Sequence, residues 1–293
     1  MKKIFFLNTF LLLCSGLLMN CTREVTSEVE FVPQIFITGG VNAVEKKATL
    51  RIQRSVPIDS NTPDFVTNAK VTLYTKDKNG NTSVVTNNFS ESNGAYESID
   101  IIDPIVGNQY WIEVSIPNED SFKSIPETLK EIVPIKSIEI VNNIPRIIFD
   151  DVENERNFYY LSIVYFIDFN PIDSDEIVIN DILFDGNKDT FLEPEINKAF
   201  DILLVQLTHV NANTYQYLTN VDILREFRNI NIEGENPGEL FSTPPVNVTG
   251  NMTNTTKSQT ALGNFAAINY DTSIFTIEIT ANKTMVLSKK HVP

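Results

Sequence analysis

The sequence predicts a mainly β protein, with an N-terminal antiparallel β-sandwich followed by a second β-rich domain that carries one or two short helices. Two observations support this fold class. Short segments of alternating apolar and polar residues recur between turn-forming residues. The hydrophobic share of 42% is also sufficient for a sizeable core. We expect a signal peptide at 1–20, a lipidated tether at 21–30, the sandwich at 31–125 and the second domain at 126–293.

The first twenty residues have the pattern of a secretory signal peptide. The basic start Met1-Lys2-Lys3 precedes an apolar run from Ile4 to Met19, and this order is typical of such peptides. The run is shorter and more interrupted than a membrane-spanning helix of about 20 apolar residues. We therefore expect export of the chain.

The end of the apolar run, Leu17-Leu18-Met19-Asn20-Cys21, resembles a bacterial lipobox. This resemblance implies that Cys21 is acylated, palmitate included, and becomes the mature N-terminus. More than one acyl chain is what stable membrane anchoring requires. The alternative is ordinary signal cleavage that leaves Cys21 as a free thiol.

Alternation of period two marks the strands of the first half. It is found in Ala48–Gln53, in Ala69–Leu73 and in Tyr110–Ile116, and it places one face of each strand on a core. The Asn-Gly pair within Asp77–Asn81 is typical of a tight hairpin turn. By the same period Trp111 lies on the outward face, which makes it a candidate contact residue.

The first half also resembles the carboxypeptidase-regulatory or transthyretin-like module, a transthyretin- or immunoglobulin-like sandwich. The matching pieces are Ala69–Tyr74, Asn79-Gly80, Gly94-x-Tyr96 and Gly107–Val114. The resemblance concerns the fold and implies no peptidase activity. In either interpretation Gly94 supplies a turn and Tyr96 an aromatic side chain for the core.

The second half begins with a proline-containing segment, 126–145, which we interpret as a linker strand. Asn157–Phe166 is too apolar for a sheet covered on one face, so both faces should be covered. Asp201–Leu207 predicts another strand. An apolar stripe at helical spacing predicts a helix near 214–229, with Asn213 as its N-cap.

The order of these pieces resembles a family of Bacteroidetes outer-membrane lipoproteins with a domain of unknown function, family 4249. The stretches that carry the resemblance are Asp150-Asp151, Asn157–Tyr160, Asn180–Gly186, Leu207–Val210, Tyr215–Leu218, Asn236–Gly238, Pro244–Asn251 and Ala261–Phe265. The resemblance implies a cell-envelope lipoprotein that is often encoded beside a TonB-dependent receptor. It implies no established catalytic activity.

Charge and motif content restrict the chemistry. The formal net charge is −15, which argues against nucleic acid as a partner because phosphate contacts need clustered Lys and Arg. The sequence contains no nucleophile elbow, C-x-x-C, H-E-x-x-H or P-loop. His209 ends an apolar strand, and we expect a structural imidazole with satisfied hydrogen bonds. His291 lies in a tail that we expect to be solvated.

One acidic loop has the ligand spacing of a calcium site. Asp185, Asn187 and Asp189 place oxygen atoms at every second residue, but Thr190 and Ile196 stand where an EF-hand loop has Gly and Glu. We interpret the loop as a solvated turn and expect that no bound ion is needed for stability.

These observations favour a non-enzymatic lipoprotein of the outer membrane, anchored through Cys21 and exposed either to the periplasm or at the cell surface. We expect an accessory subunit of a TonB-dependent receptor that acts in ligand capture or uptake. The alternative is a structural or adhesive surface protein that binds glycan or matrix. We expect no catalytic residue, cofactor, metal ion or nucleic-acid partner, and the ligand stays open.

Overall fold

The computed structural model describes residues 31–57, 60, 62–142, 144–194, 200–229, 247–279 and 285–291. The expected signal peptide, the tether and Cys21 lie outside these residues. Within them the mainly β class is confirmed, with several sheets in a sandwich-like or barrel-like arrangement. The expected helix is confirmed as α2 (Ala212–Asn229).

The first sheet contains twelve strands. Its main path runs β5 (Thr82–Thr86), β4 (Lys70–Lys76), β8 (Gln109–Ser115), β9 (Ser121–Ser124), β17 (Thr249–Asn254), β18 (Gln259–Ile268), β1 (Ile35–Asn42), β2 (Lys47–Arg54), β7 (Ala95–Ser98) and β6 (Phe89–Ser92). Beside this path β10 (Glu127–Thr128) pairs with β8, and β3 (Asp64–Phe65) pairs with β2. β1 and β18 are parallel, and the other pairings are antiparallel.

One hydrophobic core lies inside this sheet. Leu73 of β4 and Ile112 of β8 belong to the same buried cluster as Ile37 of β1, Ile52 of β2 and Tyr96 of β7. Strands from distant parts of the path therefore face one another across a common core, as in a sandwich. The alternation expected in β2, β4 and β8 places its apolar members in this core.

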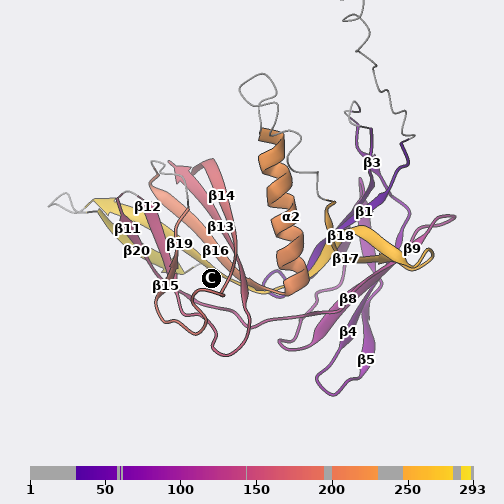
Figure 1. Cartoon of the computed structure of the whole chain (residues 1–293), viewed down its shortest axis with the longest axis horizontal. Helices are drawn as coiled ribbons and strands as arrows, with labels where there is room; N and C mark the ends of the chain where they lie inside the picture. The colour runs from indigo at the N-terminus through magenta and orange to yellow at the C-terminus, as the bar shows by residue number, and fades with distance from the viewer. Residues whose placement is uncertain are drawn as a thin grey trace, which may run out of the picture. The chain divides into compact units, whose positions relative to one another are not determined.

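Part of the expected second domain lies in the first sheet. Residues 249–268 form β17 and β18, which connect β9 to β1 through hydrogen bonds. In Figure 1 these orange and yellow strands run beside the indigo β1. The physical reason is burial, because Met252 of β17 and Phe265 of β18 complete the core that the first-half strands leave open. The expected division at residue 125 therefore does not hold for this hairpin.

The remaining strands form two sheets around a second core. One sheet contains β11 (Ile135–Val141), β12 (Ile144–Phe149) and β15 (Thr190–Leu192). The other contains β14 (Asn170–Asn180), β13 (Phe158–Ile167), β16 (Ile202–Val210), β19 (Tyr270–Ile279) and β20 (Met285–His291). Side chains from both sheets, such as Phe149 and Tyr159, share the second buried cluster. The segment 126–145, expected to be a linker strand, contains β10 and β11 and the first residues of β12. The tail 288–291 forms the end of β20.

Helix α2 covers the other face of β13, as the apolar character of that strand predicted. The Phe158 ring packs on Tyr215 with 4.7 Å between centroids, and Arg225 forms an ion pair with Glu176. The helix begins at Ala212, so Asn211 precedes it and Asn213 lies inside its first turn. Asn213 is therefore not the N-cap. Its side-chain amide donates to Glu127 instead.

The prediction for Trp111 is wrong in one respect. The side chain does point away from the core cluster, but it is only 6% exposed. Tyr74 stacks on its ring at 5.4 Å between centroids, and the Lys123 ammonium lies 5.5 Å from the ring centroid. Period-two alternation gives the face of a strand and not what its neighbours place over that face. Trp111 is therefore no exposed contact residue.

Candidate functional site

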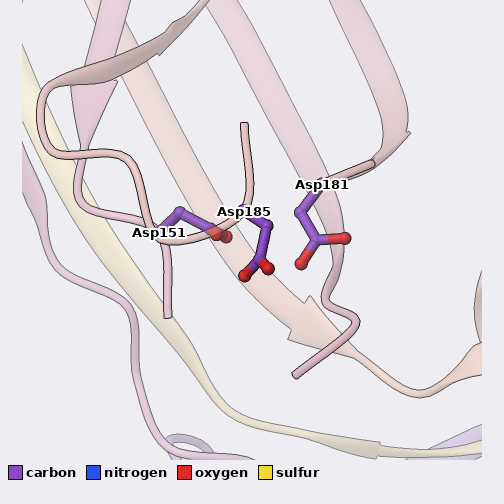
Figure 2. Close-up of side chains that lie close together, drawn as sticks. All are labelled: Asp151, Asp181 and Asp185. Carbon is purple, nitrogen blue, oxygen red and sulfur yellow. The ribbon is translucent and has the colours of Figure 1, made fainter. Parts of the chain in front are cut away.

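A cluster of three aspartates lies where β13 begins and β14 ends. Asp151 follows β12, Asp181 follows β14 and Asp185 lies in the next loop. Carboxylate oxygens of all three lie within 4.8 Å of one another. Figure 2 shows the three side chains side by side. Asp151 and Asp181 are each only 2% exposed, whereas Asp185 is exposed.

Hydrogen bonds hold the two buried carboxylates in place. Asp151 accepts a bond from the Tyr159 hydroxyl at 2.5 Å and another from the Gly186 backbone N–H at 2.6 Å. Asp181 accepts from the backbone N–H of Asn157 at 2.7 Å. Burial and the bond to Asp151 raise the pKa of the Tyr159 hydroxyl far above its ordinary value, so this group stays a neutral donor. The site is therefore built into the fold and not only into a surface loop.

His209 lies beside this site. It is the cross-strand partner of Tyr159, and the two rings are 5.3 Å apart between centroids. The imidazole is buried as expected, but its Nε2 atom has no hydrogen-bond partner among the described residues. Burial, reinforced by the Lys130 charge, lowers the pKa of His209 to about 4. The ring is therefore neutral at neutral pH.

The neutral state of His209 predicts a pH dependence of stability. In the unfolded chain the imidazole has its ordinary pKa of 6.5, so the unfolded state binds the proton first as the pH falls. Stability is therefore full above about pH 6.5 and declines from there towards pH 4. We expect a loss of about 2 kcal/mol between pH 7 and pH 5 from this group. Urea unfolding of the wild type and of His209→Phe measures it, and an equal slope in both proteins would contradict the assignment.

A second buried polar cluster joins α2 to the first sheet. Glu127 is buried, and its Oε1 atom accepts from the side-chain amides of Asn213 at 2.9 Å and of Asn251 at 3.2 Å. The Asn251 side chain also bonds both the N–H and the C=O of Phe265. Burial raises the pKa of Glu127, against the lowering effect of the asparagine amides. These contacts fix the helix start against β17 and β18, which is a structural role.

A shallow hollow of about 190 Å³ lies between α2 and the β13–β14 pair. Its lining includes Tyr160, Glu176, Tyr217 and Arg225. Pockets that enclose small molecules usually measure about 300–1,000 Å³. This hollow is therefore too small to serve as an enclosed small-molecule site.

The sequence-predicted residues are placed as follows. Cys21 lies outside the described residues. Of the calcium-like spacing, only Asp185 joins the acidic site, because the Asp189 carboxylate pairs with Lys136 and the Asp189 N–H donates to Asp150. Sequence reasoning missed Asp151 and Asp181 as site residues, although both stand in stretches that carried the family resemblance. Their presence in those stretches was the one feature of the sequence that could have indicated these two aspartates as site residues.

None of the helices formed by described residues is both long and apolar enough to cross a membrane.

Comparisons with known proteins give a family and no function. Among curated proteins, none matches the chain. A solved tetra-tandem repeat from the extending region of a large adhesion protein is 14% identical, with a TM-score of 0.20, over 61% of this chain and 45% of that one. The FN1–FN3 domains of chicken CNTN1 are 12% identical, with a TM-score of 0.21, over 60% of each chain. The chain thus spans about half the length of these structures, and scores this low support no argument. The model of DUF4249, a domain of unknown function, matches residues 22–274. Because that match covers most of the chain, the protein belongs to the DUF4249 family.

Proposed function

We propose that this protein is a non-enzymatic outer-membrane lipoprotein that assists a TonB-dependent receptor in ligand capture or uptake. The observation that carries the proposal is the N-terminal segment, in which a basic start and an apolar run end at Cys21. The receptor partner and the Bacteroidetes origin rest on the family resemblance drawn from the sequence. The transthyretin-like kinship of residues 31–125 is part of the same proposal.

A surface feature supports partner binding. The hairpin tip between β13 and β14 exposes Ile167, Phe169 and Ile172, and Phe169 is 83% exposed. The backbone of Phe169 has a φ angle of +61°, a conformation that bulky residues rarely adopt. Such strain persists only where the surroundings impose it. An exposed aromatic residue held in this way suits burial against a partner protein.

The anchor can be tested by replacing the cysteine. Cys21→Ala should abolish incorporation of labelled palmitate and move the protein from the membrane to the soluble fraction, because one thiol carries the acyl chains. Cys14→Ala is the matched control and should keep both label and membrane location. Label retained in Cys21→Ala would refute the lipobox assignment.

The same membrane preparations test the receptor. Wild-type protein extracted in mild detergent should co-purify with a β-barrel receptor, and a purely monomeric extract would count against the proposal. Phe169→Asn removes the exposed aromatic ring and should therefore weaken this association. The variant should keep the fold, because asparagine tolerates the positive φ angle. Val84→Asn on β5 removes another exposed apolar side chain and should leave the association unchanged.

A further inference from the structure

The acidic site carries charge that no ion pair of the described residues neutralises. Neighbouring acids do have cationic partners: Lys136 lies 2.9 Å from Asp150 and 2.5 Å from Asp189, and Lys188 lies 3.5 Å from Glu153. None of the ion pairs formed by described residues includes Asp151, Asp181 or Asp185. Three carboxylates this close repel one another strongly when two of them are removed from water.

Among the described residues, the hydrogen-bond donors to the buried carboxylates bring no positive charge to the site. The described contacts to the two buried carboxylates come from neutral donors, a tyrosine hydroxyl and backbone N–H groups. His209 is the nearby base on the same strand pair, and its ring is neutral at neutral pH because burial lowers its pKa. A positive charge from outside the chain would remove the repulsion.

A buried amide oxygen gives an independent indication of a ligand. Asn157 is 0% exposed, and its Oδ1 atom has no hydrogen-bond partner in the described structure. Its backbone N–H donates to the Asp181 carboxylate, and its side-chain amide donates to the carbonyl of Val152, next to Asp151. Asn157 thus contacts the Asp181 carboxylate through its backbone, and its side-chain amide bonds the carbonyls of Val152 and Glu155 in the segment that follows Asp151. A buried oxygen without a donor is costly unless something else binds it.

We propose that Asp151, Asp181, Asp185 and the Asn157 Oδ1 atom form a binding site for a divalent cation with the chemistry of calcium. All four contribute oxygen, which suits hard cations and disfavours zinc, whose usual ligands are nitrogen and sulfur. Calcium accepts six to eight oxygens in irregular arrangements, with water completing the shell, whereas magnesium demands a near-ideal octahedron. The four oxygens come from two loops, the connection between β12 and β13 and the loop after β14, so the more flexible coordination of calcium fits this site better.

The sequence alone led to the opposite expectation, that no bound ion is needed for stability. That expectation considered Asp185 together with Asn187 and Asp189, and Asp189 instead pairs with Lys136. The bound cation would connect the segment after β12 with the segment after β14. Because these segments come together only in the folded chain, binding would raise the stability of the fold with ion concentration.

The test is isothermal titration of the purified full-length protein with calcium, magnesium and zinc chloride, after treatment with chelator. We expect one calcium per chain, weaker magnesium binding, and a higher unfolding temperature with calcium than with chelator. Asp185→Asn should weaken calcium binding at least about tenfold. This variant should fold, because Asp185 is exposed. Asp181→Asn provides a second variant, and circular dichroism checks both folds.

Asp168→Asn is the matched control. Asp168 is an exposed acid with a φ angle of +50° in the β13–β14 turn, where asparagine is tolerated, and calcium affinity should not change. No calcium or magnesium binding by the wild type would overturn the proposal, and so would a preference for zinc. Affinity that is equal in the wild type, Asp185→Asn and Asp181→Asn would overturn the location of the site.

Discussion

Gly263→Ala is expected to lower the free energy of unfolding by more than about 4 kcal/mol, or to prevent folding altogether. Gly263 pairs with Ile37 in the parallel contact between β18 and β1, and its φ angle is +105°. A Cβ atom at this position would lie 1.8 Å from the backbone oxygen of Ile37. Backbone atoms of two paired strands cannot move apart by that amount without breaking the sheet. Guanidinium unfolding followed by the fluorescence of Trp111, the single tryptophan, measures the loss.

Gly80→Ala separates the clash from the backbone strain. Gly80 has a similar φ angle of +91°, but its Cβ would meet only the flexible end of Lys76 at 3.9 Å. This variant should therefore lose only about 1–3 kcal/mol, the usual strain of a side chain in such a conformation. Equal losses in the two variants would show that the close approach of β18 to β1 does not decide the stability.

Tyr96→Ala is the second large effect, with an expected loss of about 3–5 kcal/mol. Tyr96 is 3% exposed and belongs to the core of the first sheet. Its hydroxyl donates to the carbonyl of Val66 at 2.8 Å and accepts from the N–H of Ala69 at 3.0 Å. The alanine variant loses the ring from the core and also leaves two backbone groups without these partners. Thermal and guanidinium unfolding both measure the change.

Tyr96→Phe divides the effect into its two parts. It keeps the ring and removes the hydroxyl, so we expect a loss of about 1–3 kcal/mol, the usual penalty for unsatisfied buried groups. A melting temperature of Tyr96→Ala within error of the wild type would show that the side chain is not part of the core. The neighbouring turn fits the sequence-based role of Gly94, whose φ angle is +73° and whose Cβ would lie 2.7 Å from the Ile52 oxygen.

Local patterns predicted the strands well because each depends on a few adjacent residues. Alternation identified β2, β4 and β8, and the apolar run identified β13 together with the need to cover both of its faces. The Asn79-Gly80 pair correctly placed the β4–β5 turn, where Gly80 has a positive φ angle. These signals are short in range, as secondary structure mostly is.

Long-range contacts were beyond the same reasoning. Nothing in the residues of β18 indicates that it pairs with β1, since any apolar strand could fill that place. The acidic site is similar, because Asp151 lies between β12 and β13 whereas Asp181 and Asp185 lie in the loop after β14, and only folding brings the two segments together. Carboxylates are frequent in this chain, so their spacing along the sequence could not single out these three.

The place of β1 between β2 and β18 has a consequence for the order of folding. During synthesis from the N-terminus, Phe36 of β1 cannot pair with Leu262 of β18 until β18 has been made. In the same way, β9 cannot pair with β17 until β17 has been made. Until nearly the whole chain has emerged, β1 and β9 each keep an unpaired edge, which can bind other chains or chaperones. Closing contacts so distant in sequence is slow, because the entropy of the long intervening loop must be lost first. The first sheet therefore stays incomplete until residues 249–268 have been synthesised and can pair with β9 and β1.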